Sequence, residues 1–240
     1  MKIAGTTDMG FKRSDNQDRY MAGELSNGCA FAFVCDGMGG ANGGSVASEK
    51  LAKYLEECLF MQNNNISMDE EKTVMDAIDE ANRAIFVQAE NDAELKGMGT
   101  TISGLTIKNG LCKVYNAGDS RVYVLRQGEL TQVTEDHSVV QELYRQGKLN
   151  REQIADHPQK NLITRAIGVM ESVDIDVSEL SLKKGDRLLC ASDGLTNFVS
   201  EGEIKGILSH NEIFEIPKQL IDKALENKSS DNITAVVLEY

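Results

Sequence analysis

Positive charge is scarce in this 240-residue chain. It holds 25 Lys and Arg residues against 38 Asp and Glu, which gives a formal net charge of −13. Nucleic acids and anionic membranes both bind through clusters of basic side chains. The deficit therefore argues against either as a main partner. The dispersed acids favour solubility, and some of them could also hold cations.

Patterned cysteine and histidine are missing as well. The five cysteines follow no C-x-x-C spacing, and the three histidines lie far apart in the chain. This scatter is poor evidence for a disulfide framework or a zinc site. We therefore expect a chain with reduced thiols that works in the cytoplasm.

Long apolar runs are absent too. The longest purely apolar run is CAFAFVC, residues 29–35, whereas a membrane-spanning helix needs about 20 such residues. The first 14 residues, MKIAGTTDMGFKRS, lack the apolar core of a signal peptide. We expect neither a leader nor a membrane anchor.

The sequence does contain alternating strand and helix patterns. Residues 2–8 and 29–36 read as strands, and apolar residues at helical spacing predict helices over 45–60 and 69–93. A β-rich region follows, in which Asn109-Gly110 is a strong hairpin signal. We expect its strands to pair antiparallel because the turns are short. They cover 99–107, 111–118, 121–126 and 130–134.

The last hundred residues return to mixed patterns. Residues 136–170 resemble an insertion with short helices at 138–149 and 151–158. Further strands are expected at 173–180, 186–191 and 232–240, with helices that begin at the Ser200–Glu203 capping box and at about 216. Together these patterns predict one α+β domain, residues 1–240, with two packed sheets and helices on their outer faces.

Aspartates recur at the tips of the expected strands. Asp36, Asp119 and Asp193 follow apolar strands, Asp231 precedes one, and Asp18 lies in a polar segment. Each alone is best explained as a turn residue. Together they favour a shared rim, because buried carboxylates need a partner or a metal. Carboxylate ligands without histidine or thiolate favour Mg²⁺ or Mn²⁺.

The run FVCDGMGGANGG, residues 33–44, joins one of these aspartates to five glycines. It is not a dinucleotide fingerprint, because Asn42 stands where the last glycine of G-x-G-x-x-G is needed, and no Gly-Lys-Ser/Thr follows as in a P-loop. Glycines would let the backbone approach a metal closely enough for a main-chain carbonyl to bind it.

Seven short motifs complete the pattern, in order along the whole chain. They are RSDNQD at 13–18, DGMGG at 36–40, GMGTT at 97–101, GDSR at 118–121, LITRAIG at 162–168, ASDGL at 191–195 and SSDNIT at 229–234. This series resembles that of the metal-dependent, type 2C-like serine/threonine protein phosphatases in their compact bacterial form. The resemblance implies a four-layer sandwich: two antiparallel sheets between helical layers.

The resemblance also implies a role for each site residue. Asp36 would bridge two Mn²⁺ or Mg²⁺ ions, with the Gly37 carbonyl on one and Asp193 and Asp231 on the other. Asp119 would join Asp193 at a third ion, as in many bacterial relatives. Asp18 would orient water beside the metals, and Arg13 would bind the substrate phosphate with paired hydrogen bonds.

The implied reaction is attack of metal-activated water on the phosphorus of phosphoserine or phosphothreonine, without a phospho-enzyme. The implied partners are phosphorylated proteins and a eukaryotic-like Ser/Thr kinase, and we expect a monomer. Two alternatives remain: a specialised phosphatase for one regulatory protein such as an anti-sigma antagonist, and a catalytically dead module that binds phosphopeptides or metal.

Three positions depart from the family pattern. Relatives carry a histidine, proposed as the general acid, either at the position of Met38 or at that of Ala41. Gln17 stands where many eukaryotic members have Glu. The identity of the general acid is therefore open. Residues 136–170 would form the family's flap beside the site, and its cations either contact substrate or are surface charges. They are Arg145, Lys148, Arg151, Lys160 and Arg165.

Overall fold

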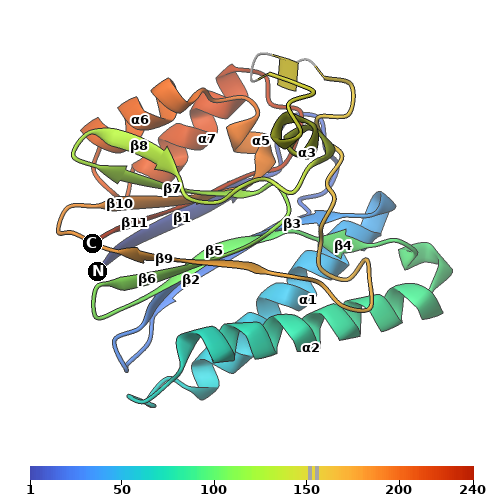
Figure 1. The fold of residues 1–240 in the computed structure, drawn as a ribbon, viewed down its shortest axis with the longest axis horizontal. Helices are drawn as coiled ribbons and strands as arrows, with labels where there is room; N and C mark the ends of the chain where they lie inside the picture. The colour runs from blue at the N-terminus through green and yellow to red at the C-terminus, as the bar shows by residue number, and fades with distance from the viewer. Residues whose placement is uncertain (151–152, 155–156) are drawn as a thin grey trace.

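The protein is a four-layer α/β/β/α sandwich, as expected. The computed structural model describes residues 1–150, 153–154 and 157–240. In Figure 1 the two sheets lie face to face, with α1 and α2 covering one outer face and α5, α6 and α7 covering the other. Both termini lie at one end of the sandwich, and α3 lies at the other end.

One sheet has five strands in the order β1-β11-β10-β7-β8, and every neighbouring pair is antiparallel. Its first and last strands in sequence, β1 and β11, pair along their full length. Its strands are β1 (Lys2–Asp8), β7 (Arg121–Arg126), β8 (Glu129–Gln132), β10 (Arg187–Ala191) and β11 (Ile233–Glu239).

The other sheet has six strands and runs β2-β3-β5-β6-β9, with the short β4 paired to β3. The sequence patterns did not reveal β2, and the strand expected over 99–107 is interrupted at Thr101. Its strands are β2 (Asp18–Glu24), β3 (Ala30–Met38), β4 (Gly99–Thr100), β5 (Ile102–Lys108), β6 (Leu111–Ala117) and β9 (Asp176–Ser181).

The helices also differ from expectation at three places. Helix α3 ends at Arg145 rather than near 149. Helix α1 begins at Gly40 rather than near 45, so that the glycine run opens a helix instead of forming a loop. A short helix, α5, follows β10 directly. The bounds are α1 (Gly40–Met61), α2 (Glu70–Asn91), η1 (Ala93–Leu95), α3 (Val139–Arg145), α5 (Asp193–Thr196), α6 (Glu201–His210) and α7 (Ile216–Glu226).

Three apolar cores fill the spaces between the four layers. Alternating side chains of β10 show the division: Leu188 and Cys190 pack between the two sheets, whereas Leu189 and Ala191 pack against the helices above. The third core joins α1 and α2 to the six-stranded sheet. Because both faces of each sheet are buried, the strand tips are where polar groups can gather.

The segment 136–170 leaves the sandwich at the end of β8. Helix α3 begins with Ser138 as its N-cap. An isolated bridge between Ser138 and Ile163 closes the base of the segment, and Ile167 pairs with Thr100. The helix expected over 151–158 lies partly outside the described residues.

Candidate active site

Four of the expected aspartates line a single cavity of about 550 Å³ at one end of the sandwich. They come from four segments: the end of β3, the β6–β7 turn, the start of α5 and the residue pair before β11. Arg13 and Gly37 line the same cavity. The acids are Asp36, Asp119, Asp193 and Asp231.

Strand pairing explains why these segments meet. In the antiparallel pair β10–β11, Ala191 faces Ala235, and the Ser192 amide donates to the Thr234 carbonyl at 3.1 Å. The end of β10 therefore adjoins the start of β11, which brings Asp193 and Asp231 to one rim. The neighbouring sheet supplies Asp36 at the end of β3.

Asp18 lies on β2, directly opposite Asp36 in the register. It is only 1% exposed. Its Oδ2 accepts hydrogen bonds from the hydroxyls of Ser192 at 2.7 Å and Thr234 at 2.6 Å. Its Oδ1 is buried and has no hydrogen-bond partner within the described part of the chain. An unpaired buried carboxylate oxygen indicates that a polar group or cation completes this site.

Electrostatics point to the same conclusion. Burial raises the pKa of Asp36 well above its usual value, and the charges of Asp18 and Asp193 raise it further. Burial likewise raises the pKa of Asp119, with Asp193 adding to the effect, and that of Asp193, with Asp231 adding to it. These carboxylates cannot all be ionised at neutral pH unless cations offset their charge.

The donor set fits a hard divalent cation. No group of three His, Cys, Asp or Glu side chains among the described residues is arranged to hold an ion alone. Mg²⁺ usually binds only one or two carboxylates, and waters or carbonyls complete its shell. A carboxylate-lined cavity that Gly37 also lines meets that requirement.

Arg13 reaches the cavity from the loop between β1 and β2. Its Nη2 donates to Asp231 Oδ2 at 2.7 Å, while its side chain remains 51% exposed. The hydrogen bond to Asp231 is the main reason that the pKa of Arg13 is raised. A guanidinium that is half exposed at the mouth of the cavity can still meet an incoming phosphate.

Several residues that position this site were missed in the sequence. Thr101 Oγ1 accepts from the Asp36 amide at 3.0 Å and hydrogen-bonds to Ser120 Oγ at 2.8 Å. Thr101 thereby joins the backbones around Asp36 and Asp119. Their only sequence signal was their place inside the motifs, as with Ser192 and Thr234, which bind Asp18.

Asn232 is another missed residue, and it holds the loop that carries Arg13. Its side-chain amide donates to the carbonyls of Met9 and Asp15, both at 2.9 Å, and accepts from the Gln17 amide at 2.9 Å. With 5% exposure it is nearly buried. Arg13 thus depends on a side chain next to Asp231, more than 200 residues away in sequence.

Gly37 has a steric reason to be glycine. A Cβ there would lie 2.1 Å from the Gly44 carbonyl oxygen and 2.7 Å from that of Gln17. The glycine run therefore lets the N-terminal part of α1 pack against the end of β3. Gly37 also lines the carboxylate cavity, so this close packing is a reason for glycine that is separate from the expected role of its carbonyl.

The segment 136–170 contributes to the cavity wall through Asn161 and Ile163. Lys160 lines an adjoining cavity of about 570 Å³, which shares Asp119 with the first. Arg145 pairs with Glu135 and Arg165 with Asp176, so these two cations are engaged within the protein. Arg151 lies outside the described residues.

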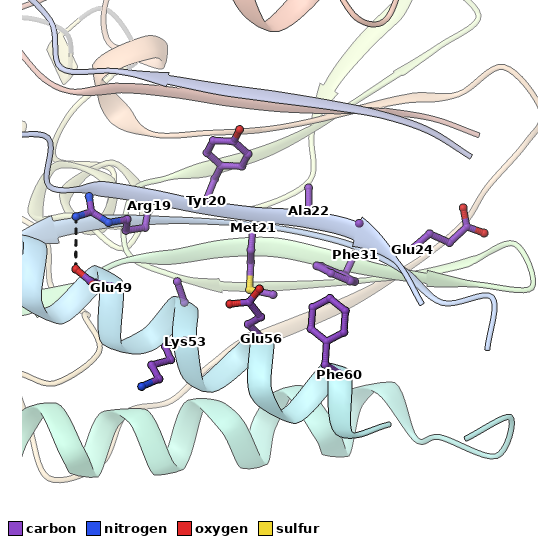
Figure 2. A pocket seen from close by; sticks show the side chains of 12 residues that line it. Arg19, Tyr20, Met21, Ala22, Glu24, Phe31, Glu49, Lys53, Glu56 and Phe60 are labelled. Atoms are coloured by element: carbon purple, nitrogen blue, oxygen red, sulfur yellow. Dashed lines mark ion pairs between the residues drawn. The ribbon is translucent and has the colours of Figure 1, made fainter. Parts of the chain in front are cut away.

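A larger cavity lies elsewhere on the described part of the chain. A groove of about 660 Å³ lies between β2 and α1, and Figure 2 shows Met21, Phe31 and Phe60 along it with the Arg19–Glu49 ion pair at one end. Its charged groups are of both signs, and the sequence motifs do not reach its apolar centre. We therefore place the candidate site in the smaller, carboxylate-lined cavity.

Comparisons with known proteins identify the family of the chain. Residues 12–227 match the family model described as protein phosphatase 2C. The serine/threonine phosphatase stp of Listeria welshimeri is 37% identical over 235 residues, covering 97% of this chain and 93% of that protein.

Solved structures show the same fold over the whole chain. The Mycobacterium tuberculosis serine/threonine phosphatase PstP/Ppp superposes with a TM-score of 0.90 at 34% identity, covering 100% of this chain and 99% of that one. The catalytic domain of PstP in complex with two manganese ions has a TM-score of 0.86 at 32% identity, with 99% and 97% covered. On this sequence match and this shared architecture, the chain belongs to the protein phosphatase 2C family.

Proposed function

We propose that this protein is a metal-dependent protein serine/threonine phosphatase that hydrolyses phosphoserine and phosphothreonine. One observation supports it above the others: four carboxylates from distant segments line one cavity in a chain of the protein phosphatase 2C family. A surface that only bound phosphate would be basic, whereas this cavity is acidic and suits cations first.

The cations proposed are two Mn²⁺ or Mg²⁺ ions, with a third at Asp119. Asp36, the Gly37 carbonyl, Asp193 and Asp231 would hold the pair, in line with the two manganese ions of the PstP structure. When bound, such ions lower the pKa of water and offset charge on the phosphoryl oxygens.

Residues of the chain itself would bind the substrate phosphate and position the water. Arg13 at the mouth of the cavity would pair with phosphoryl oxygens, releasing its bond to Asp231. Asp18, fixed by Ser192 and Thr234, would hold water through its free Oδ1. The cavity lining includes none of the five cysteines, so we propose direct attack by water rather than a cysteinyl-phosphate.

Met38 lines the cavity where some relatives have a histidine, and its thioether cannot transfer a proton. We propose that solvent protonates the departing serine or threonine oxygen. The reaction would then lack the fall in rate above about pH 6 to 7 that an essential protonated histidine would cause.

The remaining expectations are proposals on the same basis. Phosphorylated proteins are the substrates, and we propose that one is a eukaryotic-like Ser/Thr kinase. We also propose a monomeric single domain over 1–240, with 136–170 as a flap over the site. Five free cysteines favour a reducing compartment such as the cytoplasm. Among the described helices, none has the length and apolar character needed to cross a bilayer.

The test is hydrolysis of a phosphothreonine peptide with and without Mn²⁺, with the matching phosphotyrosine peptide as control. We expect turnover that requires the metal, stops on chelation and favours phosphothreonine. Tight peptide binding without turnover would indicate a binding module instead. Turnover confined to one folded partner, with no free peptide cleaved, would indicate a specialised regulatory phosphatase.

A further inference from the structure

His137 is a buried side chain that the reaction proposed above does not use. It follows Asp136 where the chain leaves β8 for the segment 136–170, and it is 6% exposed. It is not among the residues that line the carboxylate cavity. Both of its ring nitrogens are nevertheless engaged, which a space-filling role alone would not require.

On one side, His137 forms two hydrogen bonds with Gly118, the residue before Asp119. The Gly118 amide donates to His137 Nδ1 at 3.1 Å, and the His137 amide donates to the Gly118 carbonyl at 2.9 Å. Gly118 has φ +117°, and a Cβ there would lie 2.5 Å from the Thr101 side chain. The turn that places Asp119 therefore requires glycine at position 118, and these two hydrogen bonds help to hold its backbone.

The other side of His137 faces Asp176 on β9. His137 Nε2 lies 3.1 Å from Asp176 Oδ2, and Arg165 Nη1 donates to Asp176 Oδ1 at 2.6 Å. Nδ1 must be unprotonated, because it accepts from Gly118. Nε2 therefore carries the proton and donates a hydrogen bond to Asp176 Oδ2. The carboxylate fixes this tautomer, just as second partners orient histidines in metal sites.

We propose that His137 is a positioning residue that holds the Gly118–Asp119 turn in the geometry needed to bind a divalent cation at Asp119, with Asp176 and Arg165 fixing its ring. The inference rests on the proposed function, since it assigns the cation to Asp119. The hydroxyls of Thr101 and Ser120 hydrogen-bond to each other beside the same turn. Removal of the His137 ring leaves the Gly118 amide without its side-chain acceptor.

Two variants distinguish the effect of the hydrogen-bond acceptor at Nδ1 from the effect of side-chain volume. His137→Asn keeps a side-chain oxygen near the position of Nδ1, whereas His137→Leu keeps most of the volume and leaves the Gly118 amide without a partner. Mn²⁺ binding is measured by calorimetry on the full chain, with circular dichroism and thermal unfolding as a check of folding. Asp119→Asn identifies the site that depends on Asp119.

We expect His137→Leu to weaken Mn²⁺ binding at the Asp119-dependent site by about tenfold, and His137→Asn to retain affinity within about threefold. Adding His137→Leu to Asp119→Asn should cause no further loss, because both act on one site. Equal affinity in the two His137 variants, or loss only in His137→Asn, would overturn the proposal.

The proposed function fails separately. Wild-type protein that binds Mn²⁺ but never hydrolyses the phosphothreonine peptide would refute the function and leave the positioning role testable by calorimetry. Normal hydrolysis by the wild type together with unaltered Mn²⁺ affinity in His137→Leu would refute the positioning role and leave the proposed function intact.

Discussion

The two ends of strand β10 carry aspartates in opposite circumstances. Asp186 precedes the strand and is 2% exposed, yet it is fully paired: it accepts from Arg126 at 2.5 Å and from the Lys183 amide at 2.7 Å. Asp193 follows the strand and faces Asp36 and Asp231. Five residues of strand separate a completed ion pair from a cluster of like charges.

Their pKa values differ in the same way. Burial raises the pKa of Asp186, but hydrogen bonds from Arg126 and Lys183 outweigh it, so that the net shift is downward. The pKa of Asp193 is raised by burial and by Asp231. One end of the sheet uses its acid for stability, and the other holds acids that destabilise the chain until a cation binds.

The substitution Asp36→Asn should have the largest effect, and it tests whether the clustered acids serve turnover rather than stability. The substitution keeps the shape of the side chain but removes a central carboxylate charge, so we expect turnover to fall by roughly 10³-fold. Stability without metal should not fall, because the repulsion among Asp18, Asp36 and Asp193 is relieved. Steady-state kinetics and urea unfolding measure the two effects, and undiminished turnover would refute the site.

Metal binding should change stability at one end only. Mn²⁺ at 100 times its dissociation constant should stabilise the folded protein by about 2.7 kcal/mol, since the unfolded chain has no assembled site. Thermal unfolding with Mn²⁺ and with chelator measures this shift. Asp36→Asn is the control, and we expect it to lose most of the protection. Equal protection in that variant would place the bound ions elsewhere.

Asp186→Asn probes the opposite end. It leaves Arg126 without its counter-charge, and we expect a loss of about 2 kcal/mol in the free energy of unfolding, with turnover retained. The surface pair Lys218–Asp222 supplies the control: Asp222→Asn should cost under about 0.5 kcal/mol. A larger loss in the surface variant would contradict this ranking.

The pH dependence of that loss has a defined sign. The pKa of Asp186 is lowered in the folded state, so its stabilising effect is complete above the unfolded value of about 3.8 to 3.9 and fades as pH falls through the folded value. The stability difference between wild type and Asp186→Asn should therefore shrink below about pH 4. A difference that grows on acidification would reverse the assignment.

Arg13→Ala should give the smallest effect. Because Arg13 is half exposed and is proposed to contact substrate rather than the attacking water, we expect KM for the phosphothreonine peptide to rise about tenfold, with kcat changed less. Lys12→Ala, next to it in the loop, is the matched control. An unchanged KM in Arg13→Ala would remove its phosphate role.

Much of the fold was legible in local patterns. The helical spacing of Val74, Ile78 and Ile85 predicted α2 to within two residues, and Asn109-Gly110 predicted the hairpin between β5 and β6. Strand β2 was missed because DRYMAGE mixes polar and small residues at a sheet edge, where only one neighbour is needed. The early start of α1 was missed because glycine is a poor helix former, and packing against β3 decided the matter.

The amino-acid sequence was enough to predict the candidate site residues, since seven ordered motifs already contained the aspartates and Arg13. The side chains that hold these residues in place became visible only in the tertiary structure. Thr101, Asn232 and His137 act through hydrogen bonds to backbone groups 19 to more than 200 residues away, and such contacts leave no periodic trace in the chain. Spacing records the faces of helices and strands, whereas a site at strand tips depends on how separate strands are paired.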